Sequence, residues 1–359
     1  MLASSLNDRI GMSIDFYSDN VGVYIVSPVY KISKKFSKHW AGVTSFRIDA
    51  ITAASIRNGS GQGYDAVTAD ALTGASGRAG FEDVRVAPTL GMIYENENFE
   101  MDFGRYISNE IDYDVSSNYI NAKYAMNAAN TIISIGAVSS YEGWNPSTSR
   151  DLSVSTKESN QVNASLTQLF TAKSYLQFRY SEVVADGYLS SPYHYLNGGT
   201  FIRYEAYPSH RESTAWAFLY VQQLGETVAF HGSYRYGSDS WQMESETVEA
   251  KLFYDLFDNV MVGIKGRVYT QTAADFVKKI DDYTQTDTYI ATDYRLSALG
   301  TTTLGFSVSY KPESLEDKNF VFNSSFNYFQ TDKNNYIDYW YGTPQISAFY
   351  MTFGIGYDY

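Results

Sequence analysis

The chain has 359 residues, with no cysteine, 27 Lys plus Arg and 40 Asp plus Glu, which gives a formal net charge of −13. The lack of cysteine excludes disulfides and thiol chemistry, so any metal site would need His or carboxylate ligands. The acidic balance argues against a nucleic-acid surface, and we expect no nucleic-acid partner.

Aromatic residues are abundant, with 33 Tyr, 21 Phe and 5 Trp. The mean hydropathy is nevertheless slightly negative, at −0.30. No apolar run approaches the roughly eighteen residues that a membrane helix needs. This combination is typical of a transmembrane β-barrel, in which only every second residue of a strand faces lipid.

Segments in which apolar and polar residues alternate recur along the chain and are separated by turn residues, as expected for β-strands. In chain order they are 10–19, 21–32, 40–51, 84–94, 99–111, 119–126, 131–141, 161–170, 175–184, 214–224, 227–237, 241–255, 259–271, 302–311, 319–330 and the terminal segment. We therefore predict a single domain over 1–359, an antiparallel up-and-down transmembrane β-barrel of about sixteen strands. The split at Asp19-Asn20 and possible further strands in 288–311 or at 199–207 leave a range of about 14 to 18.

The connections between these segments alternate in length. Short turns lie on one side, and the other side carries the loops 52–83, 142–160, 185–213, 272–301 and 331–345. Long external loops and short periplasmic turns are the outer-membrane pattern, whereas a soluble all-β protein has no reason to sort its loops. We expect an integral, multi-pass protein of the bacterial outer membrane. The start "MLASSLNDRIG" lacks signal-peptide features. Because an outer-membrane barrel must be exported, we expect that this numbering describes a mature or re-engineered chain from which the signal peptide is absent.

The final segment, "ISAFYMTFGIGYDY", has a large apolar residue at every second position. These residues are Phe349, Met351, Phe353, Ile355, Tyr357 and Tyr359. We expect this strand to pair with the first one, because unpaired strand edges cannot face lipid. The aromatic end is similar to the signal read by outer-membrane assembly machinery, although that signal usually ends in Phe. Outer-membrane lipid and this machinery are therefore the expected partners.

Charged and polar residues alternate with the apolar face and are predicted to line the lumen. They are Arg179, His231, Arg235, Thr247, Glu249, Lys251, Lys265 and Arg267, with Glu100 and Asp102 on an earlier strand. Hairpin register puts His231 near Thr247, Glu249 near Lys265 and Thr247 near Arg267, within about two residues. Two interpretations stay open: a structural charge network, or a constriction that selects solutes by charge.

The sequence contains no convincing set of catalytic or metal-binding residues. His231, Ser233 and Asp239 lie close in sequence, but Asp239 falls in a predicted turn and the spacing does not imply a triad. His194 and His210 are predicted to be exposed loop histidines without metal-ligand spacing. We predict no catalytic residues, no cofactor and no metal; an outer-membrane hydrolase is the remaining enzymatic alternative.

Several fragments together resemble a known family: "DGYLSSPY", "YPSHRES", "FHGSYRYGSDSWQMESETVE", "RVYTQTAADF" and "TDYRLSALG". The chain resembles a family of bacterial outer-membrane β-barrel proteins of unknown function. Its members are similar in often being encoded beside a small lipoprotein, a thioredoxin-like protein and a flavin transferase. The resemblance implies location and fold, and by association it suggests a lipoprotein or periplasmic redox protein as partner.

The shared residues are predicted to form the rim and wall of the barrel. The rim residues are Gly187, Tyr188, Pro192, Tyr193, Pro208, Arg211, Trp241, Gln271 and Asp275. We hypothesise that loop 185–213 folds into the lumen as a plug against Arg235, Glu249 and Arg267. The expected function is a porin-like channel with a charged lumen. The alternative is a barrel scaffold for a lipoprotein or redox partner in an extracytoplasmic electron-transfer or flavin-linked system.

Overall fold

The computed structural model describes residues 6–20, 23–53, 56–57, 63–64, 81–110, 113–144, 155–190, 195–197, 201–312, 319–332 and 345–358. None of the helices in these ranges has the length and apolar character needed to cross a membrane.

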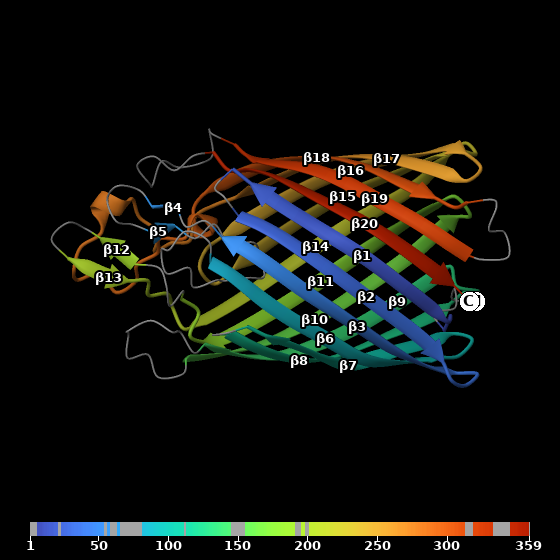
Figure 1. Ribbon diagram of the computed structural model, residues 1–359, viewed down its shortest axis with the longest axis horizontal. Helices are drawn as coiled ribbons and strands as arrows, with labels where there is room; N and C mark the ends of the chain where they lie inside the picture. The colour runs from blue at the N-terminus through green and yellow to red at the C-terminus, as the bar shows by residue number, and fades with distance from the viewer. Residues whose placement is uncertain are drawn as a thin grey trace.

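Sixteen antiparallel strands close into one barrel, as predicted (Figure 1). They are β1 (Arg9–Asp19), β2 (Val23–Lys35), β3 (Trp40–Ala53), β6 (Phe81–Glu95), β7 (Phe99–Asn109), β8 (Tyr113–Met126), β9 (Thr131–Trp144), β10 (Ser155–Thr171), β11 (Ser174–Gly187), β14 (His210–Leu224), β15 (Val228–Asp239), β16 (Glu244–Phe257), β17 (Val260–Gln271), β18 (Leu299–Tyr310), β19 (Asn319–Thr331) and β20 (Ser347–Asp358). Each strand pairs with its sequence neighbours in the barrel, and β20 pairs with β1 to close it.

The remaining elements are small and lie in the loops. They are the hairpins β4 (Ile56–Arg57) with β5 (Gly63–Tyr64) and β12 (Tyr195–Asn197) with β13 (Ile202–Tyr204), and the 3₁₀ turns η1 (Ile280–Asp282) and η2 (Tyr294–Leu296). These elements settle both open strand assignments. The stretch 288–311 contributes only β18 to the barrel, and the strand within 199–207 is β13, which pairs with β12 outside the barrel wall.

The two ends of the barrel differ in loop length, although the long-loop end also holds the short connections 20–22, 110–112 and 240–243. At the short-turn end the connections are 36–39, 96–98, 127–130, 172–173, 225–227 and 258–259, with one longer connection at 311–318. At the long-loop end they include 54–80, 145–154, 188–209, 272–298 and 332–346. Figure 1 shows the long-loop end on the left and the short-turn end on the right.

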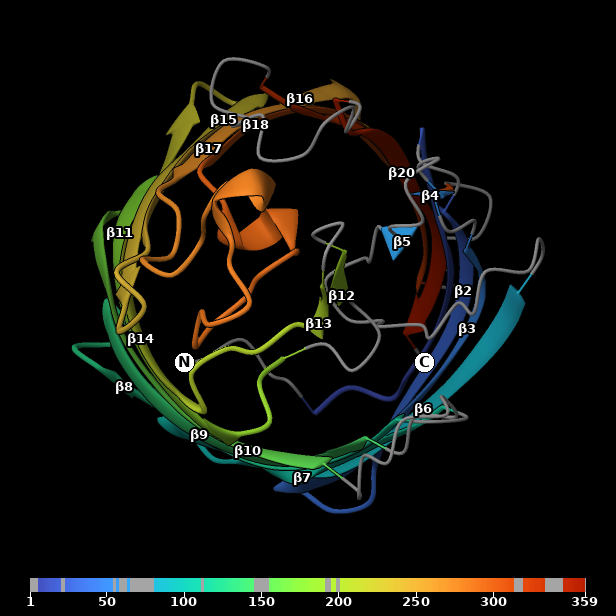
Figure 2. The ribbon, with the colours of Figure 1, turned by 90° about the vertical axis from the view of Figure 1, so that its left-hand side faces the viewer.

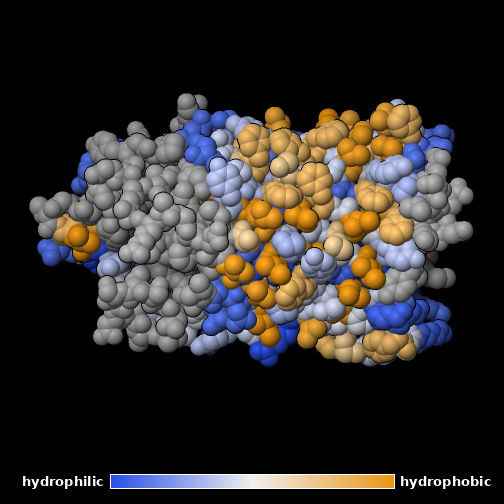
Figure 3. Space-filling view, in the orientation of Figure 1, coloured by the Kyte–Doolittle hydropathy of each residue, from blue (hydrophilic) through white to orange (hydrophobic). Residues whose placement is uncertain are grey.

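On the face of the barrel that Figure 3 shows, apolar side chains gather over the middle of the strands. On β20, Phe349 and Phe353 are 45% and 53% exposed, and their alternate neighbours face the lumen. On β18, Leu304 is 61% exposed in the same way. Apolar side chains stay exposed on every second position because lipid, rather than a protein core, is their solvent. The fold is that of a transmembrane β-barrel.

The assembly-signal residues Phe349, Phe353, Ile355 and Tyr357 lie on the outward-facing positions of β20. Phe353 packs edge-on against Phe16 of β1, with ring centroids 6.2 Å apart. Tyr359 lies outside the described residues. Their role in recognition by assembly machinery stays a prediction.

Candidate functional site

The inner face of β11 and of β15 to β17 carries the predicted lumen charges. Val248 on β16 and Ile264 on β17 are 56% and 59% exposed on the outer face, so the residues beside them point inward. The structure places the following residues on inward positions: Arg179 on β11, His231 and Arg235 on β15, Thr247, Glu249 and Lys251 on β16, and Lys265 and Arg267 on β17.

The predicted register between β15 and β16 was wrong. His231 pairs with Lys251 rather than with Thr247, which pairs with Arg235. The reason is the turn. The Asp239 N–H donates to the Met243 carbonyl at 3.0 Å, and Gln242 takes a φ of 63°, so the hairpin turns about Trp241, beyond the assumed centre.

The register between β16 and β17 lies within the stated error. Glu249 pairs with Arg267, two positions beyond Lys265, and Thr247 pairs with Tyr269, two positions beyond Arg267. Two oppositely charged residues, Glu249 and Arg267, therefore lie opposite each other on the lumen side of these two strands. The predicted neighbour of Glu249 was Lys265.

Some of the wall cations have partners. Lys251 Nζ lies 2.9 Å from Glu249 Oε1. Lys265 Nζ donates to the Tyr350 hydroxyl at 3.1 Å, reaching past Gly305, where a Cβ would come within 2.9 Å of its Cε. Arg179 Nε donates to Gln177 Oε1 at 2.5 Å. Within the described part of the chain, Arg235 and Arg267 form no ion pair with a carboxylate.

The opposite wall is largely charge-compensated. Its ion pairs are Arg47 with Asp15 (3.3 Å), Arg85 with Asp49 (2.5 Å), Lys123 with Glu100 (2.6 Å) and Lys157 with Glu142 (2.7 Å). Asp102 accepts from the Asn121 side chain at 3.0 Å. The lumen thus has a mostly ion-paired wall over β1 to β10, where Lys31 of β2 is a further lumen-facing cation, and a cationic wall over β11 and β15 to β17.

A cap covers part of the long-loop mouth (Figure 2). We define the cap as the described residues of 188–209 together with 272–298. One apolar cluster joins the cap to the turn between β15 and β16. It comprises Trp241 and Met243 of the turn and Ala274, Phe276, Ala291 and Leu296 of the cap, with Leu189, Tyr207 and Val277 packed against it. A second cluster comprises Leu196, Tyr283 and Ile290, with Phe201 beside it. The two loops also exchange backbone hydrogen bonds between Ala206 and Ile290, both 2.9 Å long.

A buried carboxylate joins the two loops of the cap. Glu205, 3% exposed, accepts from the Thr292 N–H at 2.5 Å and from the Thr292 hydroxyl at 2.6 Å. It also accepts from the Tyr207 hydroxyl at 2.5 Å. Loss of hydration, reinforced by the Glu205 charge, raises the pKa of Tyr207 well above its ordinary value. Loss of hydration likewise raises the pKa of Tyr294 to about 12, so both phenols stay neutral at ordinary pH.

The predicted rim residues fix the cap to the wall. Trp241 Nε1 donates to the His210 carbonyl at 2.9 Å, and the Asp275 N–H donates to the Trp241 carbonyl at 3.0 Å. The Arg211 guanidinium lies 4.4 Å from the Trp241 ring centre and pairs with Asp239 at 2.5 Å. Gln271 Nε2 donates to the Arg295 and Ser297 carbonyls, each at 2.7 Å.

Three further rim positions flank the first loop. Gly187 has a φ of 113°, and a Cβ there would lie 2.3 Å from the Thr156 carbonyl oxygen. The Tyr188 N–H donates to that same oxygen at 2.8 Å. Pro208 is half-buried just before β14, while Pro192 and Tyr193 lie outside the described residues.

Sequence reasoning missed the second half of the cap. Loop 272–298 contributes Phe276, Asp293 and Arg295, and Arg295 forms a two-pronged ion pair with Asp293 at 2.6–2.9 Å. The fragments "TQTAADF" and "TDYRLSALG", already singled out for their resemblance, lie in or beside this loop. Their density of polar and aromatic residues was the available signal.

A cavity of about 550 Å³ lies between the cap and the cationic wall. Leu189 and Tyr207 line it from the cap, and Arg235 and Tyr269 line it from the wall. Glu249 and Arg267 are not among its described lining residues. Of the three residues that the plug hypothesis named, Arg235, Glu249 and Arg267, the structure places Arg235 alone next to the cap.

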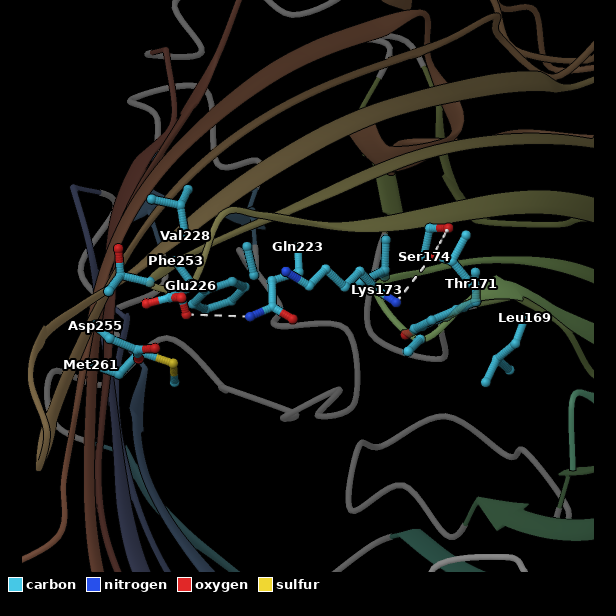
Figure 4. Close-up of a pocket in the computed structure, with 15 residues that line it drawn as sticks. Leu169, Thr171, Lys173, Ser174, Gln223, Glu226, Val228, Phe253, Asp255 and Met261 are labelled. Carbon is cyan, nitrogen blue, oxygen red and sulfur yellow. Dashed lines mark hydrogen bonds between the residues drawn. The ribbon is translucent and has the colours of Figure 1, made fainter.

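A second cavity, of about 280 Å³, lies at the short-turn end (Figure 4). Val221, Phe253 and Met261 provide apolar lining, with Lys173 and Glu226 at its edge. Both polar residues belong to the turns: Lys173 Nζ donates to the Gly225 carbonyl at 3.5 Å, and the Glu226 carbonyl accepts from Gln223 Nε2 at 3.3 Å. We find no reactive group directed into this cavity among the side chains drawn.

The residues considered for catalysis are engaged elsewhere. Asp239 accepts from the backbone N–H groups of Trp241 and Met243 at 2.9 and 3.0 Å, and it pairs with Arg211. The His231 ring packs 4.9 Å from Phe253. His210 opens β14 rather than lying in a loop, and it contacts Asp186 at 2.7 Å and Glu212 at 3.2 Å; His194 is outside the described residues. No group of three His, Asp or Glu suited to a metal ion occurs in the ranges that the structure describes.

Comparison with known proteins bears on fold and family. No curated protein matches the sequence. Among solved structures, a bacterial polysaccharide outer membrane secretin is 8% identical, with a TM-score of 0.56 over 99% of this chain and 100% of that one. The outer membrane protein OpdK from Pseudomonas aeruginosa is also 8% identical, with a TM-score of 0.49 over 98% of this chain and 99% of that one. The first of these likenesses supports the outer-membrane barrel fold alone.

The family comparison covers the second half of the barrel and the cap. A profile described as "Protein of unknown function (DUF3570)" matches residues 147–355. This range includes β10 to β19, most of β20 and both loops of the cap. Because the match spans more than half of the sequence, the chain belongs to the DUF3570 family.

Proposed function

We propose that this protein is a channel of the bacterial outer membrane that favours small anionic solutes. The observation that carries the proposal is the charge of the inner wall over β11 and β15 to β17. Among the described residues, five cations (Arg179, Arg235, Lys251, Lys265 and Arg267) face the lumen there. The inward carboxylates of these strands are Glu249, Asp239, which pairs with Arg211 of β14, and Asp255 at the short-turn end. A barrel of sixteen strands is wide enough to leave an aqueous path.

The physical argument rests on charge asymmetry. On the opposite wall, Arg47, Arg85 and Lys123 are neutralised by ion pairs and Lys31 is a single further cation, whereas Arg235 and Arg267 have no carboxylate partner among the described residues. Charges lining a narrow water-filled path between low-dielectric walls raise the local concentration of ions of opposite sign. Anions would therefore enter the lumen more readily than cations.

The proposal also implies which partners the protein has in the membrane. The apolar band needs lipid, and the closed sheet leaves no edge exposed to it. The alternating aromatic positions of β20 suit recognition by the outer-membrane assembly machinery. A lipoprotein or periplasmic redox partner belongs to the alternative, in which the barrel is a scaffold.

Planar-bilayer recording tests the channel. We expect the purified protein to conduct, with a reversal potential in a KCl gradient that shows preference for chloride. The double variant Arg235→Gln with Arg267→Gln should lower the chloride-to-potassium permeability ratio by roughly twofold or more, because it removes two unpaired charges from the path. Lys38→Gln, in the exposed 36–39 turn, changes charge outside the lumen and should leave the ratio unchanged.

Two results would count against the proposal. Preference for potassium in the unaltered protein would contradict anion selectivity. Absence of current in the intact protein, with a large current once 188–209 is replaced by a short Gly-Ser link, would indicate a closed barrel. That outcome favours the scaffold, and co-purification of a lipoprotein or redox protein would then support it.

A further inference from the structure

The cavity under the cap is built from both the wall and the cap. Its volume of about 550 Å³ lies within the range of small-molecule sites, roughly 300–1,000 Å³. Leu189, Tyr207 and Leu296 of the cap close one side, and Arg235, Tyr269 and Gln271 of the wall form the other. A solute entering the long-loop mouth beside the cap meets this cavity before the middle of the lumen.

Among the described residues, four cations line the cavity, and three of them are neutralised. Arg211 pairs with Asp239 at 2.5 Å, Arg295 with Asp293 at 2.6 Å and Lys157 with Glu142 at 2.7 Å. Arg235 forms no ion pair with a carboxylate of the described residues. The cavity therefore carries an excess of one positive charge, and that charge is on Arg235.

The backbone next to Arg235 leaves room for its guanidinium. Gly237 is two residues closer to the cap on the same face of β15, and a Cβ there would lie 3.2 Å from Arg235 Nη1. The guanidinium therefore lies along the strand toward the cap. An alanine at 237 would crowd it.

The neighbouring polar groups are already oriented. The Tyr269 hydroxyl donates to Gln271 Oε1 at 2.6 Å, while Gln271 Nε2 is held by cap carbonyls. The partners of these side chains are therefore taken, and the guanidinium is the group left to recognise a charged ligand. A planar guanidinium binds a carboxylate through two parallel hydrogen bonds.

We propose that this cavity is a binding site for small organic acids with a single carboxylate, which pairs with Arg235 under the cap. The inference rests on the proposed anion channel and deepens it by naming the solute class. One uncompensated cation balances one negative charge, so a monoanion fits better than a neutral solute or a phosphate dianion. Leu189, Tyr207 and Leu296 give the rest of the ligand a surface to pack on.

Calorimetric titration of the full-length protein in detergent tests the site. The probes are glucuronate, glucose and glucose 6-phosphate, which share a sugar ring and differ in charge. We expect glucuronate to bind, glucose to bind at least about tenfold more weakly, and glucose 6-phosphate to bind more weakly than glucuronate.

Variants locate the binding. Arg235→Gln should weaken glucuronate binding by at least about tenfold, because a charge-assisted pair is lost. Arg235→Lys keeps the positive charge but cannot form two parallel hydrogen bonds to a carboxylate. Its affinity for glucuronate should lie between that of Arg235→Gln and that of the unaltered protein. Lys31→Gln removes a lumen-facing cation from β2 on the opposite wall and should leave affinity unchanged.

The outcomes separate this site from the channel. Equal affinity of Arg235→Gln and the unaltered protein for glucuronate, or equal affinity for glucose and glucuronate, overturns the proposal, as does tighter binding of glucose 6-phosphate. Glucuronate binding that depends on Arg235 in a protein that passes no current supports the site and refutes the channel. Chloride-selective current without glucuronate binding refutes the site and leaves the channel intact.

Discussion

Gly187 shows how one residue directs the chain from the wall into the cap. Its φ of 113° lies in a region that side chains rarely adopt, and a Cβ would press against the Thr156 carbonyl oxygen at 2.3 Å. The next residue donates its N–H to that same oxygen. Only glycine combines this backbone conformation with such a close approach.

Replacement of Gly187 by alanine should destabilise the protein by on the order of 1–3 kcal/mol, from backbone strain and the clash. The measurement is a urea titration in lipid vesicles, with the folded fraction read from heat-modifiable gel mobility. The matched control is Gly266→Ala on β17, where an added Cβ meets no atom within 4 Å. Equal stability of the two variants would show that the strain at 187 is unimportant.

Among the elements, the β15–β16 turn connects the wall to both loops of the cap. Trp241 at its centre is 4% exposed and packs against Phe276 and Tyr207, with ring centroids 5.2 and 5.8 Å away. The turn therefore forms part of the apolar cluster of the cap. A tight hairpin here acts as an anchor for two loops that are distant in sequence.

Trp241→Ala should loosen the cap while the barrel stays folded. Removal of a buried Trp side chain costs about 3–5 kcal/mol, and Phe276 and Tyr207 of the cap lose the ring that they pack against. Limited trypsin digestion should then cleave at Arg203, Lys278 or Lys279 at least about tenfold faster than in the unaltered protein. Trp216→Ala on β14, outside the cap, is the control; cleavage of Trp241→Ala at the unaltered rate would contradict the anchoring role.

At the scale of the whole molecule, closure of the sheet separates lipid-facing from lumen-facing positions. Adjacent residues on one strand therefore experience different solvents. On β18, Phe306 is 49% exposed on the outer face, and Ser307 points into the lumen opposite Gly263.

Phe306→Arg should destabilise the folded barrel by about 2–4 kcal/mol, the cost of an arginine facing lipid near the bilayer midplane. Ser307→Arg adds the same charge one residue away, in water, and should cost far less. Urea titration in lipid vesicles measures both. A larger loss for the Ser307 variant would reverse the assignment of the two faces.

The sixteen barrel strands could be predicted because their signal is local. Alternation such as that of Phe349, Phe353 and Ile355 reports which face meets lipid, and it is readable within one strand. The inward positions of Glu249 and Arg267 follow from the same alternation. The pairing of His231 could not be predicted well, because the register depends on where a turn is centred, and the left-handed Gln242 is not apparent from sequence.

The sequence by itself determined the barrel, an approximate strand number and the two faces of each strand, since a period of two and the placement of turns are properties of neighbouring residues; the structure fixed the number at sixteen. Only the tertiary structure decided the cap and the cavity beneath it. Glu205 meets Thr292 across 87 positions, and Arg211, Arg235 and Arg295 converge from three elements. Such contacts depend on how the closed sheet brings distant loops together, and the pattern of neighbouring residues in the sequence does not predict them.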